Sequence, residues 1–263
     1  MATVDVFLDV NILLTLSFKL PSFLPACNKF KDDAKREKVK LHLTSSVESV
    51  FDYKVTEANN LIGILLRGLV IRVSTVRTGA QDQLLEKITL TETDKSLIRA
   101  FFGEKYAAAK TELKRVRIKA VEAWVVKRFE DMIQAVGSMS LIAFTKSMLM
   151  ENQDVYDKIS LDKNSVIKEL GVEVLPIQPS ATATTAINGI VSDPEDVPHL
   201  ASLVDYLSGK VTRQVAPNFA VYVTTDYGHV LAAKDQLKPL KIYAEEPIWG
   251  IDTCKTLMND GTP

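Results

Sequence analysis

The sequence predicts an α/β protein in which helices cover both faces of a central, mostly parallel five-stranded sheet, a three-layer α/β/α arrangement. Two observations lead to this fold class. Short runs of strand length recur in the first and last parts of the chain, and helical patterns separate them. Alternating strands and helices favour a parallel sheet with right-handed crossovers. The 263 residues, of which 46% are hydrophobic and 25% charged, are enough to bury a sizeable core.

Five segments are expected to be strands. The first is a continuous apolar run, which suits a strand that is buried on both faces. The other four alternate or are rich in β-branched and aromatic residues, and they lie next to turn or capping residues. The hydroxyl residues at 44–46 can cap a helix after the second strand. The expected strands are Val4–Leu8, Lys40–Thr44, Val172–Leu175, Phe219–Thr225 and Leu240–Ala244.

The middle of the chain is expected to be a helical insertion. Apolar residues between Leu113 and Val136 recur at steps of three and four, the stripe of a long amphipathic helix. One β-like run, GLVIRVSTV at 68–76, stays ambiguous. Ser180–Gly189, which is small and polar, is expected to be a loop near the carboxyl edge of the sheet. We therefore assign residues 1–55 and 170–263 to the α/β domain and residues 56–169 to an inserted helical subdomain.

Composition narrows the class of protein. No uninterrupted apolar run approaches the ~18 residues that span a bilayer, and the start lacks the pattern of a signal peptide, so we expect a cytoplasmic protein without a membrane partner. Cys27 and Cys254 have no CxxC or histidine companion, which favours two buried thiols over a zinc site or disulfide. Between Lys105 and Arg128, eight basic residues face two acidic ones, whereas the segment from Ile187 onward is acidic. The acidic segment suits a metal ion and the basic segment suits a polyanion such as nucleic acid. A solvent-exposed helix face that is rich in lysine would explain the basic segment equally well.

Four acidic residues are expected to meet at one edge of the sheet. Ligands of open parallel sheets bind outside the carboxyl ends of the strands. Asp9 follows the first expected strand, and Asp226 follows the fourth. Asp196 lies where a helix should begin, with Pro198 in its first turn, and Glu48 lies in the first helical turn after the second strand. A buried carboxylate such as Asp9 is costly without a partner, so a ligand is expected here.

Such a cluster points to a divalent cation. Clustered carboxylates repel one another, and Mg²⁺ or Mn²⁺, which prefer oxygen ligands, are the natural counter-charge. An ion held in this way lowers the pKa of a water molecule and neutralises the charge that builds up during phosphodiester hydrolysis. The acids therefore predict a Mg²⁺- or Mn²⁺-dependent hydrolase.

Four segments carry a family resemblance. FLDVN at 7–11, LHLTSSVESVF at 41–51, DPEDVPHLA at 193–201 and YVTTDYGHVL at 222–231 together resemble the PIN-domain family of metal-dependent nucleases. The resemblance covers roughly residues 1–55 and 170–250. It implies a PIN-like fold and an endonuclease that acts on RNA or another single-stranded nucleic acid, with RNA favoured. The implied catalytic and metal-binding residues are Asp9, Glu48, Asp196 and Asp226, supported by Asn11 and Thr224. In the insertion, the cations expected to contact the substrate backbone are Lys114, Arg115, Arg117 and Lys119.

The chain departs from the family pattern at two positions. Val10 replaces a hydroxyl residue, and Gly228 stands where many members carry another aspartate. The alternative is therefore a catalytically impaired PIN-like module that binds nucleic acid or protein. A haloacid-dehalogenase-type phosphatase would need a second aspartate where Asn11 stands, and a receiver domain would need adjacent acids and a strand-end lysine. The sequence does not decide whether the chain forms a homo-oligomer or whether it has an antitoxin-like partner.

Several candidates also have a purely structural explanation. Glu48 and Asp196 lie near expected helix N-termini, where the helix dipole favours an acid. Asn11 either orients Asp9 or caps the following helix. Asp193 is expected to be an N-cap, and His199 a satisfied surface histidine.

Overall fold

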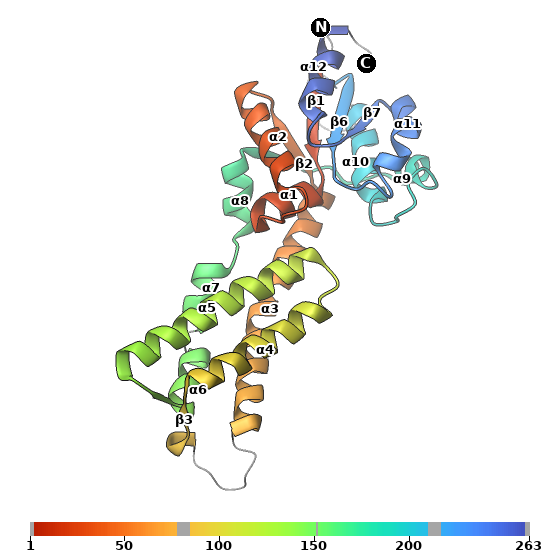
Figure 1. Cartoon of the computed structure of the whole chain (residues 1–263). Coiled ribbons are helices and arrows are strands. Elements are labelled where there is room, and N and C mark those ends of the chain that lie inside the picture. Colours follow the sequence, from red (N-terminus) through yellow and green to blue (C-terminus); the bar gives the residue numbers. More distant parts are fainter. Residues whose placement is uncertain (1–2, 78–84, 151, 210–216, 261–263) are drawn as a thin grey trace. The chain divides into compact units, whose positions relative to one another are not determined.

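The structure, a computed structural model, describes residues 3–77, 85–150, 152–209 and 217–260. Contacts within the chain define two compact units, drawn in Figure 1. Unit 1 comprises Met1–Lys54 and Asp162–Pro263, and unit 2 comprises Val55–Leu161. The second join therefore lies eight residues before the boundary that we placed at 169/170, and helix α8 (Lys163–Leu170) belongs to unit 1.

Unit 1 is built on a five-stranded sheet. All five expected strands form, each within two residues of its predicted bounds, and every pairing in the sheet is parallel. The strand order is β5-β2-β1-β6-β7. The predicted α/β class with a central parallel sheet is thus confirmed. The strands are β1 (Val4–Leu8), β2 (Leu41–Thr44), β5 (Val172–Leu175), β6 (Phe219–Val223) and β7 (Ile242–Glu245).

The strand order places a topological switch point between β1 and β6. From β1 the chain continues to β2 on one side, and from β6 it continues to β7 on the other. The connections that leave these two neighbours therefore diverge above their carboxyl ends. In open α/β sheets, ligands bind at such a point.

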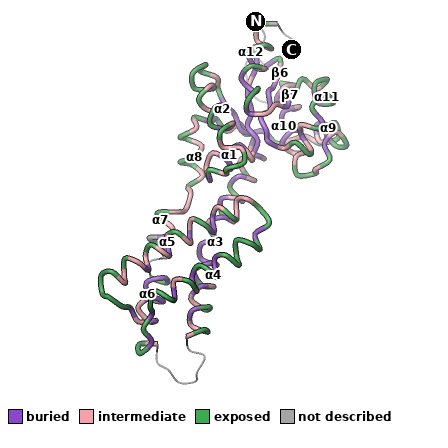
Figure 2. The backbone as a smooth tube through the Cα atoms, in the orientation of Figure 1, coloured by how far each residue is buried: buried purple, intermediate pink, exposed green. Residues whose placement is uncertain are grey.

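Helices pack on both faces of the sheet. On one face, the start of α12 (Gly250–Asp260) packs so closely that a Cβ built on Gly250 would lie 2.8 Å from Val223 Cγ2 and 3.3 Å from Phe30 Cε2 of α2. On the other face, Phe7 and Tyr222 share a buried cluster with α9 and α10. The strands lie between these layers and are largely buried (Figure 2). The helices of unit 1 are α1 (Val10–Phe18), α2 (Leu24–Arg36), α8, α9 (Ala181–Ile187), α10 (Val197–Leu207), α11 (Lys234–Leu237) and α12, with 3-10 turns at Leu231–Ala233 and Lys238–Leu240.

Unit 2 is mainly helical and has its own buried core. Helix α3 begins in unit 1 and continues into unit 2. A short antiparallel pair, β3 (Thr89–Leu90) with β4 (Met139–Ser140), accompanies the helices. The long amphipathic helix expected from the stripe at 113–136 is α5. The helices are α3 (Ser45–Arg77), α4 (Glu92–Ala108), α5 (Glu112–Val136), α6 (Leu141–Met150) and α7 (Asn152–Ile159), with a 3-10 turn at Leu85–Lys87.

Two segments differ from the sequence prediction. The β-like run at 68–76 is part of α3, because Leu65, Leu69 and Val73 repeat at steps of four and are buried together in the core of unit 2. The expected loop Ser180–Gly189 contains α9. Its N-cap Ser180 accepts a hydrogen bond from Ala183 N at 3.2 Å, which satisfies a donor of the first turn.

Helix α3 is also the one helix in the described ranges that is long and apolar enough to cross a membrane by length and composition alone. A core helix of a soluble protein passes the same test, and the buried residues of α3 in unit 2 pack into the core of that unit.

Candidate functional site

Asp9 is buried at the carboxyl end of β1, where it accepts three side-chain hydrogen bonds. Its side chain is 1% exposed, and its backbone N–H donates to the Val223 carbonyl of β6 at 2.9 Å. Tyr222 donates its hydroxyl to Oδ1 at 3.1 Å. Thr224 and Asn11 donate to Oδ2 at 2.5 and 3.2 Å. Asn11 therefore orients Asp9, one of its two predicted roles.

Burial dominates the electrostatics of Asp9. It raises the pKa of the carboxyl group, and the hydrogen bonds from Thr224 and Tyr222 oppose this shift. The charge of Asp226 raises the pKa further. The Tyr222 hydroxyl, which is buried beside Asp9, has a pKa well above its usual value for the same reasons.

Asp226 lies in the loop that follows β6, and Thr224 links it to Asp9. The Asp226 backbone N–H donates to Thr224 Oγ1 at 2.9 Å, while that hydroxyl donates to Asp9. Asp226 Oδ1 accepts from the backbone N–H groups of Gly228 at 3.1 Å and His229 at 3.0 Å. The loop backbone thus holds the second carboxylate in place.

Asp196 is the N-cap residue of α10, but its side chain caps no backbone N–H. Its Oδ2 is a buried atom without a hydrogen-bond partner, and Asp226 is one of the carboxylates that raise its pKa. Burial, followed by the charges of Asp9, Asp226 and Asp193, raises the pKa of Asp196 to about 7. The N-terminus of a helix favours a negative charge, so burial and like charges here outweigh the helix dipole.

Glu48 has a cation of its own. Lys163 Nζ lies 3.1 Å from Glu48 Oε1 and 3.8 Å from Asp52 Oδ1. The hydrogen bond to Glu48 raises the pKa of Lys163, which keeps the ammonium charged. A lysine of α8 thus pairs with Glu48, whereas the charges of Asp9 and Asp226 both act on Asp196.

These contacts limit how a metal could be held. Within the described ranges, no group of three or more His, Cys, Asp or Glu side chains is arranged to hold one ion. Asp9 is already engaged by three donors, so the oxygen donors open to a cation belong to Asp196 and Asp226. Magnesium is commonly held by one or two carboxylates and several waters. The orphaned oxygen of Asp196 fits such a ligand set, whereas the predicted cage of four carboxylates does not form.

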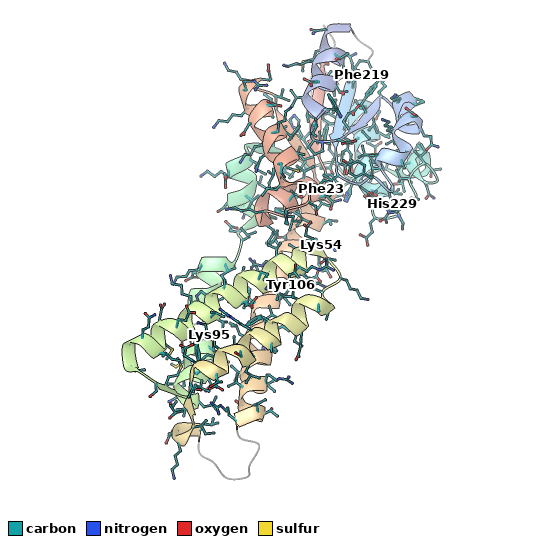
Figure 3. The ribbon with its side chains drawn as sticks, in the orientation of Figure 1. Phe23, Lys54, Lys95, Tyr106, Phe219 and His229 are labelled. Carbon is teal, nitrogen blue, oxygen red and sulfur yellow. The ribbon has the colours of Figure 1, made fainter. Side chains whose placement is uncertain are left out.

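The site includes residues that were not predicted from the sequence. Tyr222 was missed, although it lies in β6 two residues before Thr224, and both side chains donate to Asp9. Ser192 Oγ and His229 Nδ1 lie 2.6 Å apart, and each belongs to a loop that carries one of the aspartates. His229 is labelled in Figure 3. Asp193, expected to be an N-cap, instead accepts from Glu195 N at 2.8 Å.

Two further residues, His199 and Arg117, were expected to be accessible to solvent or substrate but are buried. His199 is buried and not on the surface, with an unpartnered Nδ1, and burial lowers its pKa to about 4. Arg117 of α5 is 4% exposed and donates to the carbonyls of Ala58 and Ile159 and to Asn59 Oδ1. Arg117 therefore stabilises the interior of unit 2, and its guanidinium does not face a substrate.

The other predicted substrate contacts of α5 are closer to solvent. Lys114 pairs with Glu57 at 2.9 Å and Lys119 with Glu122 at 2.8 Å, and Arg115 Nε donates to the Ala109 carbonyl.

The two cysteines, Cys27 and Cys254, are buried free thiols, and burial raises the pKa of each thiol to about 11.

Comparison of the chain with protein-family models, with curated proteins and with solved structures gave no match.

Proposed function

We propose that this chain is a Mg²⁺- or Mn²⁺-dependent endonuclease that hydrolyses phosphodiester bonds, with RNA as the favoured substrate. The proposal places it in the cytoplasm and retains the resemblance to PIN-domain nucleases. Support comes from Asp9 and Asp226, which follow the two strands that flank the switch point of the sheet. Ligand sites of parallel α/β sheets form at this position.

The observation that carries the proposal is the carboxyl group of Asp196. It has a buried oxygen without a hydrogen-bond partner, and the charges of Asp9, Asp226 and Asp193 raise its pKa. Carboxylates that repel one another are stabilised by a proton or a cation between them. At neutral pH, a divalent cation with oxygen preference is the counter-charge that satisfies this arrangement.

The residues have distinct roles in this proposal. Asp196 and Asp226 would hold the ion directly. When bound, the ion supplies a nucleophilic water of lowered pKa and neutralises charge on the scissile phosphate. Thr224 positions Asp226 through the backbone and Asp9 through its carboxylate. Asp9, held by Tyr222 and Asn11, contributes negative charge that acts on Asp196.

The substrate contacts are assigned to α5. Lys114, Arg115 and Lys119 are proposed to bind backbone phosphates, because these cations are half-buried or exposed on one helix. Their contribution should weaken with salt, as expected for phosphate contacts.

A cleavage assay tests the proposal. End-labelled RNA and single-stranded DNA are incubated with the full chain in Mn²⁺, Mg²⁺ or EDTA. We expect cleavage of RNA in either metal, none in EDTA, and a loss of about 100-fold or more in Asp196→Asn and Asp226→Asn, by analogy with removal of other transition-state charge stabilisers. Glu195→Gln, an exposed acid of the same loop, is the matched control and should keep full activity. Absence of cleavage in every condition, or full activity in Asp196→Asn, contradicts the proposal.

A second candidate is a catalytically impaired PIN-like module that binds nucleic acid. The ion pair between Glu48 and Lys163 favours it, because a carboxylate that the family pattern assigns to the metal is neutralised. Gly228, which replaces a further acid, favours it as well. Calorimetric titration with Mn²⁺ separates the two: binding that is lost in Asp226→Asn supports the nuclease, and RNA binding that persists in EDTA without any cleavage supports the module.

A further inference from the structure

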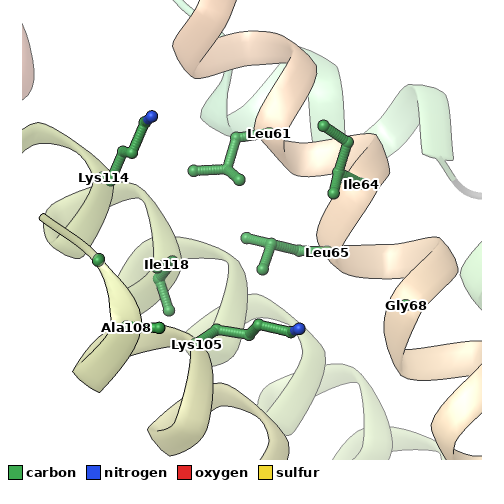
Figure 4. A pocket seen from close by; sticks show the side chains of 9 residues that line it. Leu61, Ile64, Leu65, Gly68, Lys105, Ala108, Lys114 and Ile118 are labelled. Carbon is green, nitrogen blue, oxygen red and sulfur yellow. The ribbon is translucent and has the colours of Figure 1, made fainter.

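Unit 2 contains an apolar hollow on the flank of α3, outside the acidic site. Its volume is about 260 Å³, and residues of α3 and α5 and of the C-terminal end of α4 line it (Figure 4). Leu65 and Ile118, which are 2% and 3% exposed, contribute buried apolar surface. Ile64 lines the same hollow and is 58% exposed. A large aliphatic side chain of the lining is thus left in contact with water.

The lining includes two lysines, of which one is paired with a carboxylate. Lys114 is paired with Glu57 at 2.9 Å. Lys105 Nζ lies 5.4 Å from the centroid of the Phe101 ring and, among the residues whose placement is described, has no carboxylate partner. The hollow therefore combines apolar walls with one positive charge that no carboxylate of the described residues compensates.

This combination is complementary to a small amphiphile. A single anionic group would pair with Lys105, while an aliphatic body would cover Ile64 and the other apolar residues of the lining. The volume exceeds that of a cavity of about 150 Å³ that holds benzene and lies just below the roughly 300–1,000 Å³ of sites for drug-sized ligands. A helix or strand of another protein would need a longer groove.

We propose that the hollow binds a medium-chain aliphatic carboxylate, with its carboxylate on Lys105 and its chain along α3. The proposal is independent of the acidic site in unit 1, so either can fail without the other.

The test uses octanoate as the probe and the full chain in EDTA, which keeps metal chemistry out of the measurement. Binding is followed by calorimetry and by chemical-shift changes of the methyl groups of Ile64 and Ile118. We expect saturable 1:1 binding, and about 10-fold weaker binding of octanol, which keeps the tail but lacks the charge.

Two pairs of variants assign the site. Ala108→Trp should fill the hollow and abolish binding, whereas Ala107→Trp, at the neighbouring exposed position of α4 outside the lining, should leave binding unchanged. Lys105→Gln should weaken octanoate binding about 10-fold, to the level of octanol, while Lys110→Gln, an exposed lysine outside the lining, should have little effect. Unchanged circular dichroism and melting temperature verify that each variant folds.

Several results overturn the proposal. These are absence of saturable binding, binding that Ala108→Trp leaves intact, and equal affinities for octanol and octanoate.

Discussion

At the scale of single residues, Thr224 connects the acidic site to the sheet. Its hydroxyl is buried, donates to Asp9 Oδ2 and accepts from the backbone of Asp226. One hydroxyl group thus fixes the distance between two carboxyl-bearing segments that are more than two hundred residues apart in sequence. The sequence indicated Thr224 only through a family resemblance, and the physical reason for a hydroxyl at this position follows from these two bonds.

Thr224→Val should therefore disturb the site more than its small change in shape suggests. The substitution removes one of the three donors to Asp9 and takes away the Thr224 acceptor of the Asp226 N–H, which should lower the free energy of unfolding by about 1–3 kcal/mol. Mn²⁺ binding should weaken in parallel. Urea unfolding and calorimetry measure the two effects. Thr225→Val, at the adjacent buried residue, is the control, and an equal loss in both variants would contradict the assigned role of Thr224.

Asp196 should make stability depend on pH. Its pKa is about 7 in the folded chain, against an ordinary value of 3.8. Below pH 4 both states bind the proton. Between pH 4 and 7 the unfolded chain releases it while the folded chain retains it, so stability falls as pH rises, by at most about 4 kcal/mol in the absence of metal.

Asp196→Asn removes this titration. In EDTA, the variant should match wild type near pH 4 and exceed it by about 2–4 kcal/mol at pH 8, as measured by urea unfolding. Added Mn²⁺ at pH 8 should stabilise wild type and leave the variant unchanged. The same pH slope in both proteins would show that Asp196 is not buried among like charges.

At the scale of elements, the strands of unit 1 were predictable because each is a short apolar run with turn or capping signals beside it. Helix α9 was not predictable in this way. Its sequence is small and β-branched, and its start depends on Ser180, whose N–H and hydroxyl donate to Asp205 of α10. The N-cap serine is a local feature, but the Asp205 carboxylate that holds it in place is 25 residues away and cannot be read from the local sequence.

The contact of α12 with the sheet gives a prediction at this scale. Gly250→Ala would place a methyl group 2.8 Å from Val223 and should destabilise unit 1 by about 1–3 kcal/mol. Gly103→Ala in α4 is the matched control. A Cβ at Gly103 meets nothing within 4 Å, and removing a helical glycine should stabilise by about 0.5–1 kcal/mol. Thermal unfolding measures both, and a neutral Gly250→Ala would contradict the close packing.

At the scale of the whole molecule, the two units have separate interiors. The buried cluster of unit 2 and the buried cluster around α9 and α10 in unit 1 share no residue. Each unit therefore buries enough apolar surface to respond to core mutations by itself. The chain also has one tryptophan in each: Trp124 packs on the core of unit 2, and Trp249 is 56% exposed in unit 1.

Leu69→Ala should act mainly on unit 2. Leu69 is fully buried there, and its truncation should cost about 2–5 kcal/mol. Fluorescence of Trp124 in a Trp249→Phe background should show an unfolding midpoint at lower urea. Fluorescence of Trp249 in a Trp124→Phe background should show little change, and Leu200→Ala in unit 1 should give the opposite pattern. Equal shifts of both reporters would mean that the chain unfolds as one cooperative unit.

By itself, the sequence determined the class of the fold, the strands of the sheet, the helical nature of the middle segment and the placement of Asp9 and Asp226 beyond strand ends. These features follow from periodicity and from local turn and capping chemistry, which neighbouring residues encode. Only the tertiary structure decided which acids couple, because Lys163 reaches Glu48 and Tyr222 reaches Asp9 through contacts between distant segments. It likewise decided that Arg117 faces inward and that an apolar hollow lies beside Lys105, since burial depends on how helices pack and not on their composition.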